Sequence, residues 1–175
     1  MLEVKIFTLY PDLFPGPLDI GIFKKAKENK IWNLKVINIR DYSKDNHGTV
    51  DDTPFGGGSG MLLRPDILAS ALDNNIKKGE KIIYLSPRGK KFDQNVARSL
   101  SKEKNLNLIC GHFEGVDQRL LETRNIEEYS LGDFVLSGGE PASFVIIDAI
   151  VRLLPGVLGN KDSVKEESFE NHLLE

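Results

Sequence analysis

The sequence contains little that would place the chain outside the cytoplasm. Its one cysteine, Cys110, cannot form an internal disulfide, which suits a reducing compartment. No apolar run approaches the roughly 18 residues that a membrane-spanning helix needs, and the N-terminal residues show a strand-like pattern in place of a signal peptide. Positive charge is also scarce, because 23 Lys and Arg face 26 Asp and Glu. We therefore expect a globular cytoplasmic protein, and the charge alone argues against nucleic acid as its partner.

The two common phosphate-binding fingerprints are missing as well. Neither G-x-G-x-x-G between a strand and a helix nor G-x-x-x-x-G-K-[ST] occurs. Instead, three short apolar runs each lead into a Gly-rich polar turn, at 82–89, 106–115 and 133–140. Each is typical of a buried strand that ends in a turn. Because ligands of open α/β sheets bind beyond the carboxyl ends of the strands, the three turns together predict one pocket. The alternative is that they are only tight strand-to-helix connections.

The order of the predicted elements defines the expected fold class. Strands are predicted at 4–9, 34–39, 81–85, 106–110 and 134–136, and helices at 17–27, 65–76, 93–102, 117–123 and 141–154. Alternating strands and helices predict an α/β fold with a mostly parallel sheet and helices on both faces. Between them, residues 40–60 lack apolar periodicity, and so long a segment is often a lid or a binding loop.

The predicted helix at 143–154 is apolar almost all round. Such a helix must be buried on nearly all sides, and in a chain of this size a subunit interface is a natural place for it. We therefore expect a homodimer.

Acidic residues in the turns indicate the charge of the ligand. Glu114 and Glu140 lie in two of the three turns, where carboxylates would repel a polyphosphate and attract a cationic ligand. S-adenosylmethionine is such a ligand, and Leu85, Pro87 and Leu136 could enclose its adenine.

Five segments in order carry a resemblance that covers essentially the whole chain. They are TVDDTPFGGGSGM at 49–61, YLSP at 84–87, CGHFEGVD at 110–117, SLGDFVLSGGE at 130–140 and RLLPGVLG at 152–159. In these segments the chain resembles the TrmD family of bacterial tRNA (guanine-N1-)-methyltransferases, which belongs to the SPOUT superfamily.

The resemblance implies a fold, an activity and a domain plan. The fold would be of the SPOUT type, with a deep trefoil knot, in a homodimer with active sites at the subunit interface. The activity would be methyl transfer from S-adenosylmethionine to N1 of the guanosine 3′-adjacent to the anticodon, position 37 of tRNA. Residues 1–159 would form the cofactor-binding domain, and 160–175 would be a linker toward the tRNA-binding helical domain that follows in the family. Rival interpretations are another SPOUT RNA methyltransferase and a non-catalytic nucleotide- or RNA-binding module.

The resemblance also assigns residues to the reaction. Glu167 stands where the family has its general base, an aspartate, and the neighbouring Glu166 is the alternative. Without the resemblance, both would be interpreted as a solvated charge run before a helix. Arg152 matches the arginine that contacts the target guanine; the alternative is an i, i+4 pair with Asp148, and both roles can hold together. Asp51 would bind substrate at the entrance, with loop solvation as the alternative.

The implied cofactor contacts fall on the three turns. They are Tyr84, Leu85, Ser86, Pro87, Gly111, Phe113, Glu114, Leu131, Gly132, Asp133, Phe134, Val135, Leu136, Gly138 and Gly139. Cys110 is expected to be a small buried residue and not a nucleophile. The three histidines lack metal-ligand spacing and are interpreted as surface or loop residues, namely His47, His112 and His172. No metal site is predicted, and magnesium is carried over from the family only as a candidate.

Overall fold

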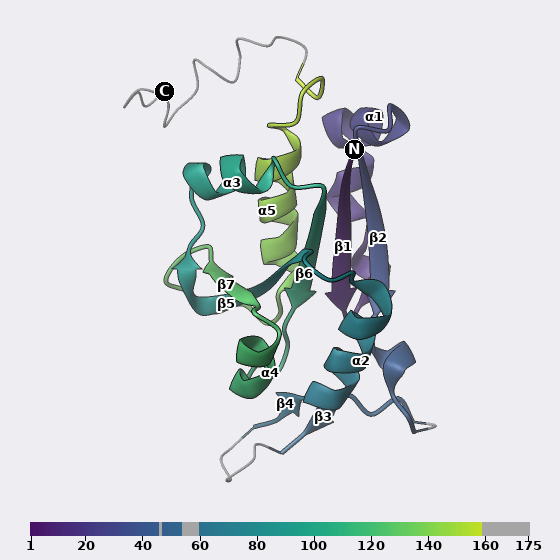
Figure 1. The fold of residues 1–175 in the computed structure, drawn as a ribbon, viewed down its shortest axis with the longest axis vertical. Helices are drawn as coiled ribbons and strands as arrows, with labels where there is room; N and C mark the ends of the chain where they lie inside the picture. The colour runs from purple at the N-terminus through teal and green to yellow at the C-terminus, as the bar shows by residue number, and fades with distance from the viewer. Residues whose placement is uncertain (46, 54–59, 159–175) are drawn as a thin grey trace.

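Five parallel strands form the centre of the structure, a computed structural model that describes residues 1–45, 47–53 and 60–158. The strand order is β2-β1-β6-β5-β7, and every pairing is parallel (Figure 1). The strands are β1 (Leu2–Thr8), β2 (Trp32–Asn38), β5 (Lys81–Lys91), β6 (Asn105–Cys110) and β7 (Glu127–Ser130). The predicted α/β class with a parallel sheet is confirmed.

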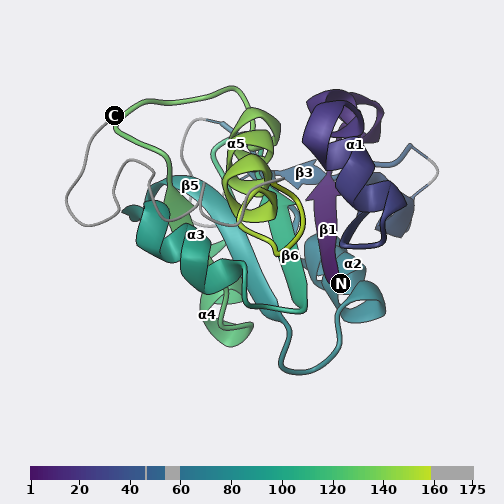
Figure 2. The same ribbon diagram turned by 90° about the horizontal axis from the view of Figure 1, so that it is seen from above.

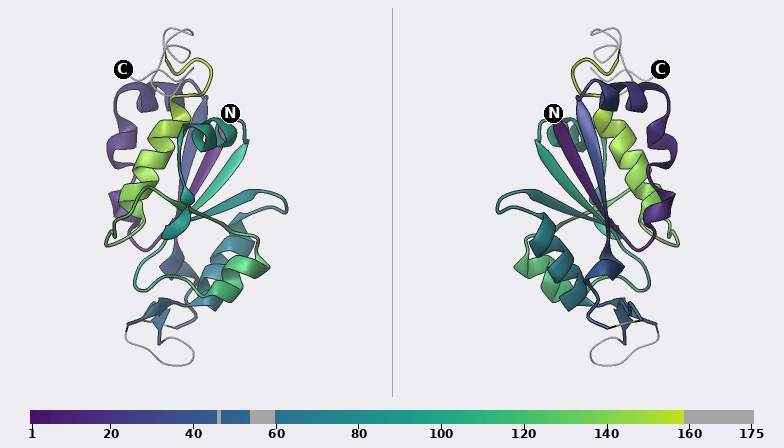
Figure 3. Two further views of the ribbon diagram at one scale, coloured as in Figure 1. Left: turned by 90° about the vertical axis from the view of Figure 1, so that its left-hand side faces the viewer. Right: turned by 90° about the vertical axis from the view of Figure 1, so that its right-hand side faces the viewer.

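Helices cover both faces of this sheet, as expected for parallel strands. One face packs against α1 (Gly21–Glu28), α3 (Gln94–Leu100) and α5 (Glu140–Val151), and the other against α2 (Pro65–Asn75) and α4 (Gln118–Thr123). Figure 2 shows α3 and α5 together on one side, and Figure 3 shows α5 and α2 on opposite sides. Side chains alternate between two apolar cores, so that Ile83 and Leu85 join the first and Tyr84 joins the second. No helix within the described ranges is long and apolar enough to cross a membrane.

The structure corrects the prediction for the third apolar run. Residues 134–136 are not a strand, and the last strand of the sheet is β7, which ends at Ser130. The side chains of Phe134, Val135 and Leu136 are exposed in an irregular segment that leads to α5. The prediction took three consecutive apolar residues as a buried strand. In the structure the same residues are exposed on the surface.

Other elements differ in their limits. The helix predicted at 17–27 is a 3₁₀ turn, η2 (Gly16–Asp19), followed by α1, because extended Ile20 and left-handed Gly21 interrupt it. The 40–60 segment contains η3 (Ile39–Tyr42) and β3 (Asp51–Asp52), which pairs with β4 (Leu62–Leu63); a further 3₁₀ turn, η1, spans Pro11–Leu13. Asp93 caps α3 as predicted, since its carboxylate accepts a hydrogen bond from Val96 N at 3.0 Å.

β5 is longer than predicted and carries an irregularity at its carboxyl end. Its pairing with β7 shifts between Leu85 and Lys90, both of which stand opposite Tyr129. Gly89 lies within this shift, and a Cβ there would sit 2.5 Å from Tyr129 N. Residues 86–89 therefore have no partner in the register with β7, and pairing resumes at Lys90.

A buried ion pair joins the sheet to the turn before β5. Lys5 Nζ lies 3.0 Å from a carboxylate oxygen of Glu80 and donates to the Asn75 carbonyl at 2.8 Å. The two charged side chains are only 7% and 9% exposed. Removal of one partner would leave the other charge buried and uncompensated.

We therefore expect Lys5→Met to lower the free energy of unfolding by about 3–5 kcal/mol in urea titrations. The matched control is Lys81→Met, because the Lys81–Glu127 pair has the same 3.0 Å separation but is more exposed. Its expected cost is below about 1 kcal/mol. Equal effects of the two substitutions would contradict the buried pair's structural role.

Candidate functional site

A cavity of about 370 Å³ lies at the carboxyl ends of β5, β6 and β7. Its size is within the range of small-molecule sites. Three segments from the three strand ends line it, 84–88, 111–116 and 129–139, apart from Asp133, and Ala142 of α5 adds to the lining. The sequence predicted one pocket built from three turns, and the structure brings those turns together in this way.

The implied cofactor contacts lie in this cavity with one exception. All of them line it except Asp133. The lining also includes residues that were not among the implied cofactor contacts, namely Arg88, His112, Gly115, Val116, Tyr129, Ser130, Ser137 and Ala142. The pocket is thus mostly backbone and apolar side chains, with few charged groups.

Glycines allow the turns to approach one another. A Cβ at Gly111 would lie 2.5 Å from the ring of Tyr84, and a Cβ at Gly139 would lie 2.7 Å from Cys110 Cα. Gly139 N also donates a hydrogen bond to the Gly111 carbonyl at 3.0 Å. The segment that precedes α5 is therefore fixed directly on the end of β6.

Aromatic and apolar side chains stand at the edge of the pocket. Phe113, Phe134 and Leu136 are all exposed although they are large and apolar. Phe113 has φ +59°, which is an uncommon conformation for a bulky residue and costs on the order of 1 kcal/mol. Exposed apolar groups and backbone strain both concentrate at binding sites.

The charges around the pocket disfavour a polyphosphate. Arg88 is the one arginine of the lining, and its guanidinium donates to Glu128 at 2.9 Å and to Gln118 at 2.7 Å. No lysine lines the cavity within the described part of the chain. Glu114 does line it and is exposed, so it supplies the negative charge that the sequence predicted.

Glu140 does not have the position that the sequence suggested. Its side chain is 2% exposed and does not line the pocket, so it cannot contact a ligand there as Glu114 can. It accepts a hydrogen bond from Thr8 Oγ1 at 2.5 Å and lies 2.7 Å from His112 Nε2. The carboxylate turns into the protein because these two groups hold it there.

His112 lies in the turn after β6, as the surface-or-loop prediction allowed, but its side chain is largely buried. Its side chain is 13% exposed, and its ring packs against Tyr10 with centroids 4.8 Å apart. Sequence analysis missed His112 and Glu140 as partners, because 28 residues separate them and no spacing rule joins them. Cys110 is fully buried as predicted, and burial raises the pKa of its thiol well above the ordinary value.

The segment with the predicted substrate residue Asp51 is attached to the pocket. Asp51 lies in β3 opposite Leu63 of β4, and Leu63 N donates to the Gly115 carbonyl at 3.0 Å. Glu114 N donates to the Met61 carbonyl at 2.9 Å. Asp51 therefore stands one strand away from the pocket-lining turn and does not itself line the cavity.

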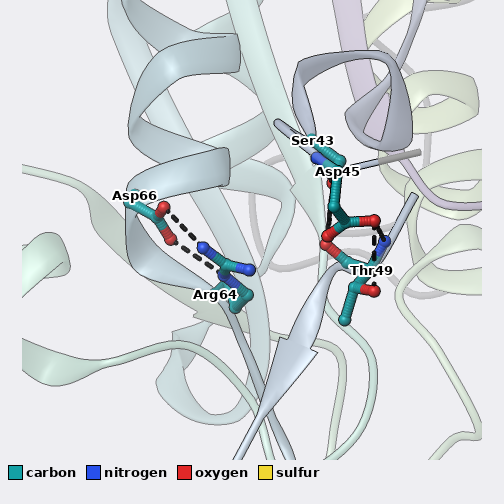
Figure 4. A network of polar contacts seen from close by, with 5 residues as sticks. All are labelled: Ser43, Asp45, Thr49, Arg64 and Asp66. Atoms are coloured by element: carbon teal, nitrogen blue, oxygen red, sulfur yellow. Dashed lines mark hydrogen bonds and ion pairs between the residues drawn. The ribbon is translucent and has the colours of Figure 1, made fainter. Parts of the chain in front are cut away.

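Polar contacts hold the chain on either side of β3 and β4 (Figure 4). The Asp45 carboxylate accepts hydrogen bonds from the backbone of Thr49 and from that of His47, and these bonds hold its pKa below the usual range despite the opposing effect of desolvation. At the start of α2, Arg64 makes a two-fold contact with Asp66, which raises the pKa of the guanidinium. The ends of this segment are thus ordered by local contacts, and His47 is exposed as predicted.

Of the predicted catalytic residues, Arg152 lies far from the pocket of its own chain, and the others lie outside the described residues. Arg152 follows the carboxyl end of α5, whereas the pocket lies at the amino end, and a 12-residue helix is about 18 Å long. Arg152 lines a separate groove with Pro17, Phe23 and Val145, and it lies close enough to Asp148 to oppose the rise in pKa that burial gives that carboxyl. Lying outside the described residues are Glu166, Glu167 and His172.

No cluster of three or more His, Cys, Asp or Glu suited to a metal ion occurs among residues 1–45, 47–53 and 60–158.

The fold and pocket define an α/β protein with helices on both faces of a parallel sheet and a small-molecule pocket at its strand ends. A family model, tRNA (Guanine-1)-methyltransferase TrmD, matches residues 2–175, and the chain belongs to this family. A tRNA (guanine-N(1)-)-methyltransferase of Pelagibacter ubique is 67% identical over all of this chain and 77% of its own length. Proteins of the same name from Bartonella tribocorum and from a Wolbachia of Culex pipiens are 53% and 51% identical, over 99% and 95% of this chain and 74% and 73% of their own lengths.

Proposed function

We propose that this chain transfers a methyl group from S-adenosylmethionine to N1 of the guanosine at position 37 of tRNA. Membership of the TrmD family supports the reaction class. The observation that carries the proposal is the pocket, because three turns from three parallel strand ends converge on one cavity, and all but one of the cofactor contacts that the resemblance implies line it. A cytoplasmic location is part of the same proposal, since tRNA is the substrate.

The donor set of the pocket fits S-adenosylmethionine. Backbone groups of Gly-rich turns can hydrogen-bond an adenine, and Leu85, Pro87 and Leu136 offer apolar surface to it. The exposed carboxylate of Glu114 suits a ligand that carries a sulfonium and an ammonium, and Arg88 is already engaged by Glu128. When bound, the cofactor supplies the methyl group on its sulfonium.

The remaining chemistry belongs to the chain. Guanine N1 carries a proton and is a poor nucleophile until a base removes it, a role that we assign to Glu167. Arg152 is proposed to contact the guanine and to stabilise negative charge on O6 as the proton leaves. Transfer is in line from sulfur to nitrogen, so positioning of the two substrates is a large part of the catalysis.

The active site is proposed to need a second copy of the chain. Within one chain, α5 separates Arg152 from the pocket by about 18 Å, so one copy's arginine must meet the partner's pocket. α5 is also less completely covered than its apolar sequence predicted, because Val145 is 54% exposed beside the groove that contains Arg152. Pairing of this face in a homodimer would cover Val145 and complete the site.

We expect Val145→Asp to weaken the dimer by on the order of 100-fold, because each interface would then bury an unpaired carboxylate. Methyl transfer should fall in parallel, while binding of S-adenosylhomocysteine is retained. Analytical ultracentrifugation over a range of protein concentrations measures the change. Asn74→Asp is the matched control, since it adds the same charge to an exposed position of α2 on the opposite face of the sheet. A dimer equally stable in both variants would contradict this interface.

The knot and the domain plan complete the proposal. We propose that the segments around the three turns, which meet at one cavity, form the trefoil knot of the SPOUT fold. Residues 1–159 are proposed to be the cofactor-binding domain, and 160–175 a linker toward a tRNA-binding domain. Magnesium is a candidate cofactor, and EDTA should then abolish transfer until magnesium is returned.

Mapping of the methylated nucleotide tests the function. The chain in excess over unmodified tRNA, with labelled S-adenosylmethionine, should yield N1-methylguanosine at position 37 when nuclease fragments are analysed by mass spectrometry. Methylation of another nucleotide would favour a different RNA methyltransferase of the superfamily. Cofactor binding without transfer to any tRNA would favour a non-catalytic binding module.

A further inference from the structure

A buried carboxylate lies directly behind the cofactor pocket. Glu140 begins α5 and is 1% exposed, whereas most glutamates are found at the surface. A Cβ on the pocket-lining residue Gly138 would lie 2.6 Å from Glu140 Oε2, so this carboxylate touches the back of the pocket wall. Burial of a carboxylate costs free energy unless other groups bind it, so the groups that bind Glu140 indicate why it is buried there.

Two side chains bind this carboxylate, one from the end of β1 and one from the turn after β6. Thr8, at the end of β1, places Oγ1 at 2.5 Å from Glu140 Oε1, and His112 places Nε2 at 2.7 Å from Oε2. Tyr10 N donates to Thr8 Oγ1 at 2.9 Å, which directs the hydroxyl proton of Thr8 toward Glu140. Its place in the first turn of α5 also favours the carboxylate, because the amino end of a helix attracts negative charge.

His112 connects this pair to both neighbouring turns. It lies between Gly111 and Phe113 in the turn after β6, and all three line the pocket. Its ring fills the space where a side chain on Gly138 would stand. The side chain of His112 therefore reaches from the turn after β6 to the segment before α5 and keeps the two apart. Any shift of the ring would change the separation of these two walls.

We propose that Glu140 is a positioning residue for the cofactor: held by Thr8, it fixes His112, and His112 sets the distance between two walls of the pocket. This inference deepens the proposed function and rests on it. Thr8 does not line the cavity, so it can affect a bound cofactor only through the groups that it contacts, namely Glu140 and Tyr10, whose ring also packs against His112. The two pocket walls that His112 separates would shift if the Thr8–Glu140 contact were lost. Loss of the Thr8 hydroxyl should therefore weaken cofactor binding without altering the reacting groups.

The first test is Thr8→Val, which preserves side-chain shape and removes both the donor to Glu140 and the acceptor of Tyr10 N; Glu140→Gln, which leaves Tyr10 N bonded to Thr8, must show the same effect. We expect the dissociation constant of S-adenosylhomocysteine, measured by calorimetry, to rise about 10-fold, in line with an unsatisfied buried group. The KM for S-adenosylmethionine should rise by a similar factor, while kcat stays within about twofold. Thr8→Ser, which keeps the hydroxyl, should restore both constants to near the wild-type values.

Lys5→Met is the control that separates an effect on cofactor binding from a general loss of stability. Lys5 lies in β1 like Thr8 and is buried, but it does not line the pocket. It should lower the unfolding midpoint and leave the dissociation constant unchanged. A Thr8→Val protein that is less stable but binds as tightly as wild type would overturn the inference. Should Thr8→Val not fold, the near-isosteric Glu140→Gln must show the same loss of affinity, and unchanged affinity there overturns it equally. If the wild-type chain binds no S-adenosylhomocysteine, the proposed function fails first and this inference falls with it.

Discussion

Replacement of Gly139 by alanine is expected to lower the affinity for S-adenosylhomocysteine by about 10- to 100-fold, as measured by calorimetric titration. The backbone of Gly139 has φ −80° and ψ −10°, which alanine adopts without strain. The added methyl group, however, would lie 2.7 Å from Cys110 Cα and 3.0 Å from Gly111 N, and backbone cannot move aside as a flexible side chain can. The two pocket walls that these residues form must therefore separate.

The control for this substitution is Gly79→Ala. Gly79 has φ +90° and open space around its Cα, so alanine there adds backbone strain without a collision. It lies in the turn before β5, at the opposite end of that strand from the pocket. We expect a loss of roughly 1 kcal/mol in stability and no change in affinity. Equal loss of affinity in both variants would show that the effect of Gly139→Ala is not local to the pocket.

The second large effect is expected for Glu167→Gln. A glutamine cannot accept the N1 proton of guanine, so the single-turnover rate of methyl transfer should fall by about 10²- to 10⁴-fold. Affinity for S-adenosylhomocysteine should stay the same, because Glu167 is assigned to the base and not to the cofactor.

Glu166→Gln is the adjacent control and removes the same charge one residue away. It should reduce the rate by less than about threefold, since only one carboxylate can be the base. A large loss in Glu166→Gln with a small loss in Glu167→Gln would exchange the two assignments. Small losses in both would remove this pair from the mechanism.

Sequence reasoning predicted the sheet well where burial follows a simple period. β1, β6 and the first half of β5 are short, mainly apolar runs, and the cap at Asp93 follows from a polar residue before a helical pattern. The strand prediction failed at residues 134–136, because an exposed apolar segment beside a pocket has the same composition as a buried strand. The strand that does occupy the sheet edge, β7, is only four residues long and begins with two glutamates, so no periodicity marks it.

The pocket could be predicted from the sequence, whereas the side-chain contacts that support it could not. Three Gly-rich turns after strands meet wherever the strands are parallel and adjacent, so the walls follow from topology. The Thr8–Glu140–His112 contacts depend on three side chains that are distant in sequence, and pairing across 132 and 28 residues leaves no local pattern. The separation of Arg152 from the pocket likewise follows only from the length of α5.

The most direct test of the central claim is a crystal structure of the chain with S-adenosylhomocysteine at saturating concentration. The account predicts one ligand per chain in the cavity at the ends of β5, β6 and β7, with its adenosine against Leu85, Pro87 and Leu136. It also predicts Arg152 of the partner subunit at the mouth of that cavity. Ligand density in the groove beside Val145, with the cavity at the strand ends empty, would contradict it.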